Sequence, residues 1–295
     1  MATQRAARGL SRPPLSGPWG LAPAALVLGL LVATGLGYAV AQSLGALPLT
    51  GEPEVGLGAY RTLRADDGGD LWASAGFTLW VTAASTLVAA AMALAAVAWL
   101  DRPRPRRRGL ATGLLHLNLA IPHVVWAFAV LLVLSQSGVA ARAGAAVGLL
   151  DAPSDFPVLV RDRYGIGIVL HYATKEAPFL ALVGVAITRA QPRELAVIAQ
   201  TLGATGLRRL RLVTLPVVGP GLAVASALVF AFVFGAYEAP VVLGASSPRL
   251  LSVLSRDLFS ASDLTRRPEA MALGVLMAVF VIAVVGAAAV GGRRR

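Results

Sequence analysis

Long apolar runs separated by short polar segments dominate this chain. A helix needs roughly 20 mostly apolar residues to cross about 30 Å of hydrocarbon, because each residue adds about 1.5 Å. Six runs reach that length: residues 21–41, 71–100, 110–135, 166–188, 215–243 and 270–290. The pattern predicts an all-α, polytopic integral membrane protein with six transmembrane helices. We expect one transmembrane domain over residues 21–292, preceded by a basic tail over residues 1–20.

The composition supports a membrane protein and excludes several other classes. Of 295 residues, 57% are hydrophobic and only 14% are charged, whereas soluble domains are closer to half apolar and a quarter charged. The chain has no cysteine, which excludes disulfides and cysteine-ligated metal sites. Its net charge of +11 comes from basic residues between the apolar runs, so it indicates membrane topology rather than nucleic-acid binding.

The charges of the connecting segments predict an orientation. Sixteen basic and two acidic residues fall on the side of the two termini, whereas nine basic and eleven acidic residues fall on the opposite side. Lysine and arginine are retained in the cytoplasm, so we expect both termini there. The first run, ending in Ala39-Val40-Ala41, also resembles a cleavable signal peptide. It is longer than the usual apolar core of a signal peptide, so we expect a retained span.

The segment between the fourth and fifth runs, residues 189–214, carries a distinct pattern. Pro192 can begin a helix, and apolar residues recur at i, i+3, i+4 and i+7 from Leu195 to Leu202. Gly203 then ends this helix, which is too short to span a membrane. A second, basic helix leads to Pro216. Such a segment can transmit force from a cytosolic partner to two spans, or lie on anionic lipid; the pattern alone leaves both open.

The spacing of several residues in this segment resembles a family signature. Three residues separate Ala199 from Gly203, nine separate Gly203 from Val213, and one separates Val213 from Leu215-Pro216. This resembles the permease subunits of binding-protein-dependent ABC importers, whose signature is Glu-Ala-Ala, three residues, Gly, nine residues, Ile, one residue, Leu-Pro. Val197 and Ile198 replace the Glu and the first Ala of the signature, and Val213 replaces its Ile. Glu194 lies one helical turn before the missing Glu.

Four further segments extend the resemblance to roughly residues 71–290: residues 121–123, 172–179, 235–240 and 262–272. They are most similar to a subgroup of polyamine, ferric-iron and thiamine importers. The resemblance implies a type I ABC importer transmembrane-domain fold and a bacterial inner-membrane location. It also implies that residues 193–202 form the coupling helix that sits in a groove of an ATP-hydrolysing subunit.

The resemblance further implies three protein partners: an ATP-binding subunit, a second permease subunit and an extracytoplasmic solute-binding protein. The chain has no Gly-x-x-x-x-Gly-Lys-Ser/Thr phosphate loop. We therefore expect ATP to be bound by the partner subunit, and we expect this chain to have no cofactor, no catalytic residues and no nucleic-acid partner. Two permease subunits, identical or related, would enclose a pathway that alternates between the two sides of the membrane.

Polar residues in the spans are candidate pathway groups, because a charge in hydrocarbon costs roughly 2.5–3.5 kcal/mol and usually faces a cavity or a partner. The candidates are His171, Lys175, Glu176, Tyr237 and Glu238. Lys175 and Glu176 point about 100° apart on a helix, so they do not pair along one face. They either line the pathway or form an ion pair with another span, for which Glu238 is a candidate. Pro240 is expected to break the fifth helix.

The polar residues in the spans allow two other hypotheses, of which only the first competes with the importer. The first is a proton-coupled secondary transporter using His171, Glu176 and Glu238, although the halves of the chain show no inverted repeat. The second is a metal site at His116 and His123, which is disfavoured because a proline separates the two residues and no acid lies nearby in sequence. Polyamine is the first substrate hypothesis, since the two glutamates suit a cation; iron and thiamine follow.

Overall fold

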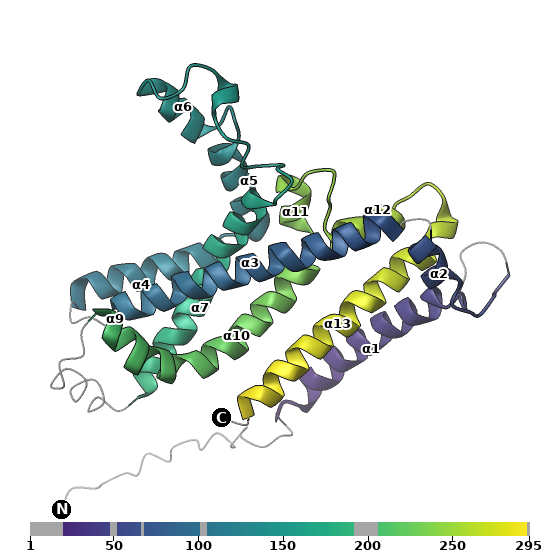
Figure 1. Cartoon of the computed structure of the whole chain (residues 1–295). Helices are drawn as coiled ribbons and strands as arrows, with labels where there is room; N and C mark the ends of the chain where they lie inside the picture. Colours follow the sequence, from purple (N-terminus) through teal and green to yellow (C-terminus); the bar gives the residue numbers. More distant parts are fainter. Residues whose placement is uncertain (1–19, 48–51, 66–67, 101–104, 192–205, 294–295) are drawn as a thin grey trace, which may run out of the picture.

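The computed structural model describes residues 20–47, 52–65, 68–100, 105–191 and 206–293. Within these ranges every regular element is a helix (Figure 1). In chain order they are α1 (Ala22–Ser43), α2 (Gly58–Ala65), α3 (Gly68–Leu100), α4 (Pro105–Ala120), α5 (His123–Leu134), α6 (Val139–Ala146), η2 (Pro153–Asp155), α7 (Ile166–Ala190), α9 (Gly206–Arg209), η3 (Leu210–Thr214), α10 (Leu215–Gly235), α11 (Glu238–Leu243), α12 (Leu251–Phe259), η4 (Leu264–Arg266) and α13 (Arg267–Arg293).

Six segments of the described chain are long and apolar enough to cross a membrane, which confirms the predicted number of spans. They are Ala22–Ser43, Asp70–Leu100, His123–Ala146, Ile166–Ala190, Leu210–Gly235 and Leu264–Gly291. Two differ from the expected runs. The run expected over 110–135 is divided into α4 and α5, and the run expected over 215–243 is divided into α10 and α11.

The centre of the bundle is formed by α3 and α7, which run parallel along much of their length (Figure 1). Gly165, before α7, lies against Phe77 and Val81, whereas Gly184 lies against Val97 near the far ends of both helices. A Cβ on Gly184 would approach a methyl carbon of Val97 to 2.6 Å, so the missing side chain permits this close packing. α10 packs against both helices and completes the core.

The other long helices lie outside this centre. α13 packs against α10 and α12, and α1 packs along α13. The last residue of α1, Ser43, lies at the same hollow as Pro268 at the start of α13, so these two helices are antiparallel. Most apolar side chains of α1 are exposed; an example is Leu31, at 63%. A helix that is apolar all round yet this exposed is typical of a lipid-facing span.

The end of the bundle that carries α2, α11 and α12 is here called the α12 end. There the short helix α12 is joined to α3 by two polar contacts. The Leu251 amide donates to Thr78 Oγ1 at 2.9 Å, at the start of α12. Arg249 donates to Asp70 on α3 at 3.3 Å and to Asp257 on α12 at 3.0 Å. These contacts fix α12 against the first half of α3.

Candidate functional site at the break between α4 and α5

The third apolar segment is interrupted at Pro122, where α4 and α5 both pack against α7. α4 ends at Ala120, and Pro122 is extended, with φ −59° and ψ 146°, before α5 begins. In a continuous helix the N–H of residue 122 would donate to the carbonyl of Asn118, but proline has no N–H. Proline also disfavours the helical conformation of Ile121 before it. The local sequence therefore breaks the helix and leaves the last carbonyls of α4 short of donors.

Lys175 of α7 places its ammonium group against these carbonyls. Its Nζ donates to the carbonyl oxygen of Ile121 at 2.6 Å and also to that of Asn118. Lys175 is buried, at 2% exposed. The carbonyl end of a helix carries partial negative charge, which favours a cation there. Within the described chain, the direct partners of this lysine are thus backbone carbonyls of α4, and no carboxylate lies within ion-pair distance of it.

Glu176 reaches the opposite side of the same break. Its Oε1 lies 3.7 Å from Nε2 of His123, the first residue of α5. The glutamate side chain is 11% exposed, against 32% for the histidine. Neighbouring residues on a helix point about 100° apart, so Lys175 and Glu176 reach different partners. Two adjacent side chains of α7 therefore contact the two helix ends that flank Pro122.

Aromatic rings surround this pair of contacts. His171 is fully buried, and its ring centre lies 4.7 Å from that of Tyr172 and 6.1 Å from that of His123. Phe232 of α10 lies 5.0 Å from His123 and 6.4 Å from Tyr172, between ring centres. Neither ring nitrogen of His171 has a hydrogen-bond partner in the described structure. The cluster thus combines one carboxylate, two imidazoles and two further rings.

The remaining two candidate residues, Tyr237 and Glu238, lie at a second helix break. α10 ends at Gly235 and α11 begins at Glu238, so the break comes before Pro240 rather than at it. Pro240 lies in the first turn of α11, where its missing N–H would have had no helical acceptor. Tyr237 is 37% exposed and Glu238 is also exposed. α11 packs against α5 and α7, and Glu238 is close enough to His123 to act on it electrostatically.

The structure thus gathers most of the polar residues singled out in the spans, and it adds three that sequence reasoning missed. These are Asn118, His123 as the partner of Glu176, and Phe232. The sequence feature that could have indicated this site is Pro122, because a proline inside an apolar run leaves carbonyls of the preceding turn without their helical donors. His116 takes no part, because its Nδ1 contacts the Thr112 carbonyl within α4 at 2.7 Å. No group of three His, Asp or Glu that could hold a metal ion occurs among the described residues.

The segment expected to contact an ATPase is described only in part. Glu194, Ala199 and Gly203 lie outside the described residues. The basic helix expected before Pro216 is present as α9 and η3, which continue directly into α10. η3 is a single π-helical turn that contains Val213, and Leu215 and Pro216 are the first residues of α10. Pro216 has no N–H to donate to the preceding turn. Because the regular hydrogen bond is missing there, the backbone readily accommodates the wider π-helical turn just before it.

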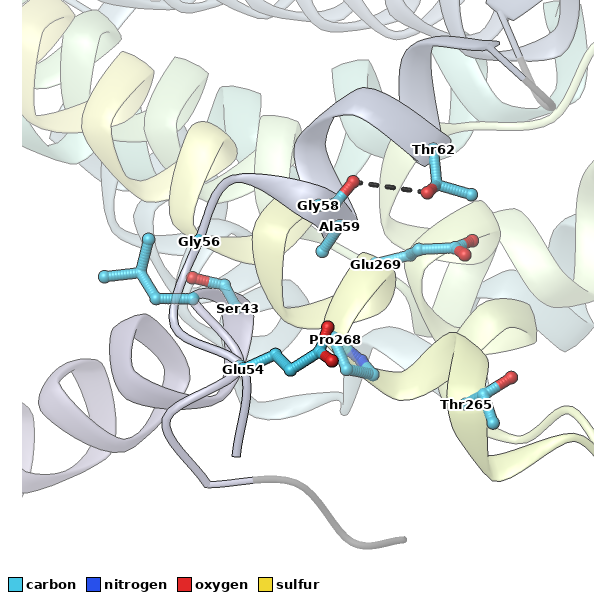
Figure 2. Close-up of a pocket in the computed structure, with 11 residues that line it drawn as sticks. Ser43, Glu54, Gly56, Gly58, Ala59, Thr62, Thr265, Pro268 and Glu269 are labelled. Carbon is cyan, nitrogen blue, oxygen red and sulfur yellow. Dashed lines mark hydrogen bonds between the residues drawn. The ribbon is translucent and has the colours of Figure 1, made fainter. Parts of the chain in front are cut away.

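A separate hollow of about 190 Å³ lies between the end of α1, α2 and the start of α13 (Figure 2). It brings together two glutamates from distant segments, Glu54 and Glu269. The latter accepts from Arg266 at 3.2 Å. Gly45 has a φ of +74°, and a Cβ there would lie 2.3 Å from the carbonyl oxygen of Glu54, so only glycine fits this turn. The hollow does not adjoin the polar cluster at Pro122, with which it shares no residue.

Comparison with known proteins identifies relatives along most of the chain. The trehalose transport system permease protein SugA of Mycobacterium tuberculosis is 29% identical over 286 residues, which cover 92% of this chain and 89% of SugA. The probable molybdenum ABC transporter permease HVO_B0370 of Haloferax volcanii is 28% identical over 67% of this chain and 70% of its own. The inner membrane ABC transporter permease YnjC of Escherichia coli K12 is 27% identical over 170 residues, and this match spans only 31% of YnjC.

Solved structures share the fold. A bacterial ABC transporter involved in import of the acidic polysaccharide alginate has a chain that matches with a TM-score of 0.71 and 19% identity, over 94% of this chain and 98% of that one. The alginate transporter in complex with its pentasaccharide-bound periplasmic protein matches with a TM-score of 0.72 and 21% identity, over 94% of both chains. The all-α fold of an ABC importer transmembrane domain, expected from the sequence, is thereby confirmed.

The family described as "Binding-protein-dependent transport system inner membrane component" matches residues 88–291, from the middle of α3 to near the end of α13. This range includes the break at Pro122, the polar residues of α7 and the segment 189–214. The chain belongs to the family of inner membrane components of binding-protein-dependent transport systems.

Proposed function

We propose that this protein is the membrane-spanning permease subunit of an ATP-driven importer in a bacterial inner membrane, with both termini in the cytoplasm. The family match over residues 88–291 is the observation that carries the proposal. Three partners complete the transporter: a separate ATP-hydrolysing subunit, a second permease subunit that is identical or related, and an extracytoplasmic binding protein that docks on the α12 end. In this scheme the chain hydrolyses no ATP itself.

In this proposal, residues 193–202 form the coupling helix, and Glu194, Ala199 and Gly203 belong to the contact with the ATPase. Val213, Leu215 and Pro216 form the rigid return into α10. The continuous helical path from α9 through η3 into α10 supports this role, because a stiff connection transmits displacement to a span. α7 enters the same segment from its other side, so two core helices would move together.

We further propose that the cluster around Pro122 lines the translocation pathway and that the substrate is an organic cation of the polyamine type. Two acids, Glu176 and Glu238, lie near aromatic rings that include Tyr172 and Phe232, and both kinds of group attract cations. Tyr237 and Glu238 are exposed beside the cluster and could contact a passing solute. The relatives are named for trehalose and molybdenum, so family membership does not decide the substrate.

Reconstitution tests the function. The chain is placed in proteoliposomes with its ATPase, second permease subunit and binding protein, and uptake of labelled solute is measured with and without ATP. We expect uptake only with ATP, and we expect Gly203→Val to abolish uptake and the stimulation of ATP hydrolysis by the binding protein. Uphill uptake by the chain alone on a proton gradient would refute the importer and favour the secondary transporter.

A separate measurement tests the substrate. Calorimetric titration of the cognate binding protein with spermidine, thiamine, ferric citrate and trehalose should give binding for spermidine, and labelled spermidine should be taken up by the full transporter. ATP-dependent uptake of another solute, without uptake of spermidine, would refute the polyamine proposal and leave the permease proposal standing.

A further inference from the structure

The break at Pro122 is bounded by two helix ends of opposite partial charge, and α7 supplies the matching charge to each. At the carbonyl end of α4, Lys175 Nζ donates to Ile121 and Asn118. At the amino end of α5, Oε1 of Glu176 lies 3.7 Å from Nε2 of the His123 side chain and makes no hydrogen bond within the described residues. The unpaired N–H groups at the start of a helix carry partial positive charge and favour a nearby anion. Lys175 therefore contacts the backbone of α4 directly, whereas Glu176 lies near the amino end of α5 and reaches it through the His123 side chain.

We propose that Lys175 and Glu176 are positioning residues that clamp the break in the third segment to α7, so that displacement of α7 moves α4 and α5 with it. The two side chains are adjacent in sequence and diverge by about 100°, which lets one turn of α7 contact both helix ends. α5 also packs directly on α7 and α11, so a tethered α5 would carry the neighbouring α11 along. This coupling role rests on the proposed importer function.

The surroundings of the clamp make the loss of either residue costly. Lys175 is 2% exposed, and without it the partly buried carbonyl of Ile121 would lose its donor, while that of Asn118 would keep only the Ile121 N–H, at 3.2 Å. The charged and titratable groups that face the pair are His123 on α5, His171 and Tyr172 on α7, and Glu238 on α11. None of these four carries a fixed positive charge that would replace the ammonium group.

A double-mutant cycle tests the carbonyl contact without any transport assay. Lys175→Met keeps a side chain of similar length but donates no hydrogen bond. Pro122→Ala restores an N–H that can donate to Asn118 in a continuous helix, which makes the ammonium group redundant. We expect Lys175→Met to lower the thermal midpoint of the purified transporter strongly in the native background and much less in the Pro122→Ala background. Equal losses in both backgrounds would overturn the capping role.

The coupling role is tested in the reconstituted transporter with Lys175→Met, Lys175→Arg, Glu176→Gln and Glu176→Asp. We expect Lys175→Met to keep ATP hydrolysis but to lower uptake per ATP by at least about tenfold, the factor that one charge-assisted hydrogen bond is worth. Glu176→Gln should lower uptake per ATP by less, because Glu176 makes no hydrogen bond that the change removes. The matched controls, Lys175→Arg and Glu176→Asp, should retain most of the coupling. Unchanged uptake per ATP in the folded Met and Gln variants would overturn the clamp.

The two proposals fail in different ways. If the native transporter shows no ATP-dependent uptake, the importer proposal fails, while the thermal cycle still decides whether Lys175 caps α4. If Glu176→Gln raises the KM for the solute but leaves uptake per ATP intact at saturation, Glu176 acts on the solute without coupling α5 to α7, and the clamp is overturned while the pathway role stands.

Discussion

Gly184 provides the sharpest test of the packing between α3 and α7. A Cβ at this position would lie 2.6 Å from Cγ2 of Val97 and 3.2 Å from Cγ1 of Val218. Both neighbours are buried and β-branched, so neither can rotate away cheaply. Overpacking of this kind costs about 1–3 kcal/mol, and the better helix propensity of alanine returns about 0.5–1 kcal/mol. Gly184→Ala should therefore lower the free energy of unfolding by up to about 2.5 kcal/mol.

Two other glycines supply matched controls. A Cβ on Gly274 of α13 would meet nothing within 4 Å, so Gly274→Ala should be neutral or slightly stabilising. A Cβ on Gly221 of α10 would lie 2.5 Å from Cδ1 of Ile187, the movable tip of a side chain, so Gly221→Ala should cost less than Gly184→Ala. The assay is unfolding of the three variants in mixed detergent micelles, followed by circular dichroism.

The reasoning also predicts a rescue. Shortening the obstructing side chain by Val97→Ala should make Gly184→Ala less harmful, so the two changes together should cost less than the sum of the single changes. If Gly184→Ala is as stable as Gly274→Ala, or if the two costs simply add, the close contact described here does not limit the packing of α3 against α7.

Three further predictions concern the α12 end. Thr78→Val removes the acceptor for the buried amide of Leu251 and should cost about 1–3 kcal/mol of unfolding free energy, whereas Thr78→Ser should cost little; equal losses would contradict this. Arg249→Met should cost no more than about 1 kcal/mol, with the loss vanishing in molar salt; a salt-independent loss would refute an ionic contribution. Hydrogen bonds from Thr265 lower the pKa of Asp263, so this contribution to stability should be complete above about pH 4 and be lost as pH falls through the lowered pKa. Asp263→Asn should remove this step from an acid titration of stability, and an unchanged titration would contradict it.

The sequence by itself determined the number of spans and the helical class. A run of about 20 apolar residues can satisfy its backbone hydrogen bonds in lipid only as a helix. The number of spans and the helical class therefore follow from length and composition. Pro122 also fixed the break between α4 and α5 locally, because no packing can supply its missing N–H. The expectation of one helix over 110–135 was wrong because the apolar pattern runs through Pro122, whereas the backbone cannot continue as a helix there.

Only the tertiary structure decided what the intramembrane charges contact. Lys175 binds carbonyls 54 and 57 positions away, and a backbone carbonyl leaves no mark in the pattern of side chains. Nor does the sequence set how α7 is rotated, since most of the spans are apolar on every face. Gly184 packs closely against Val97 of α3, and from this arrangement Lys175 and Glu176 reach the two ends of one broken helix.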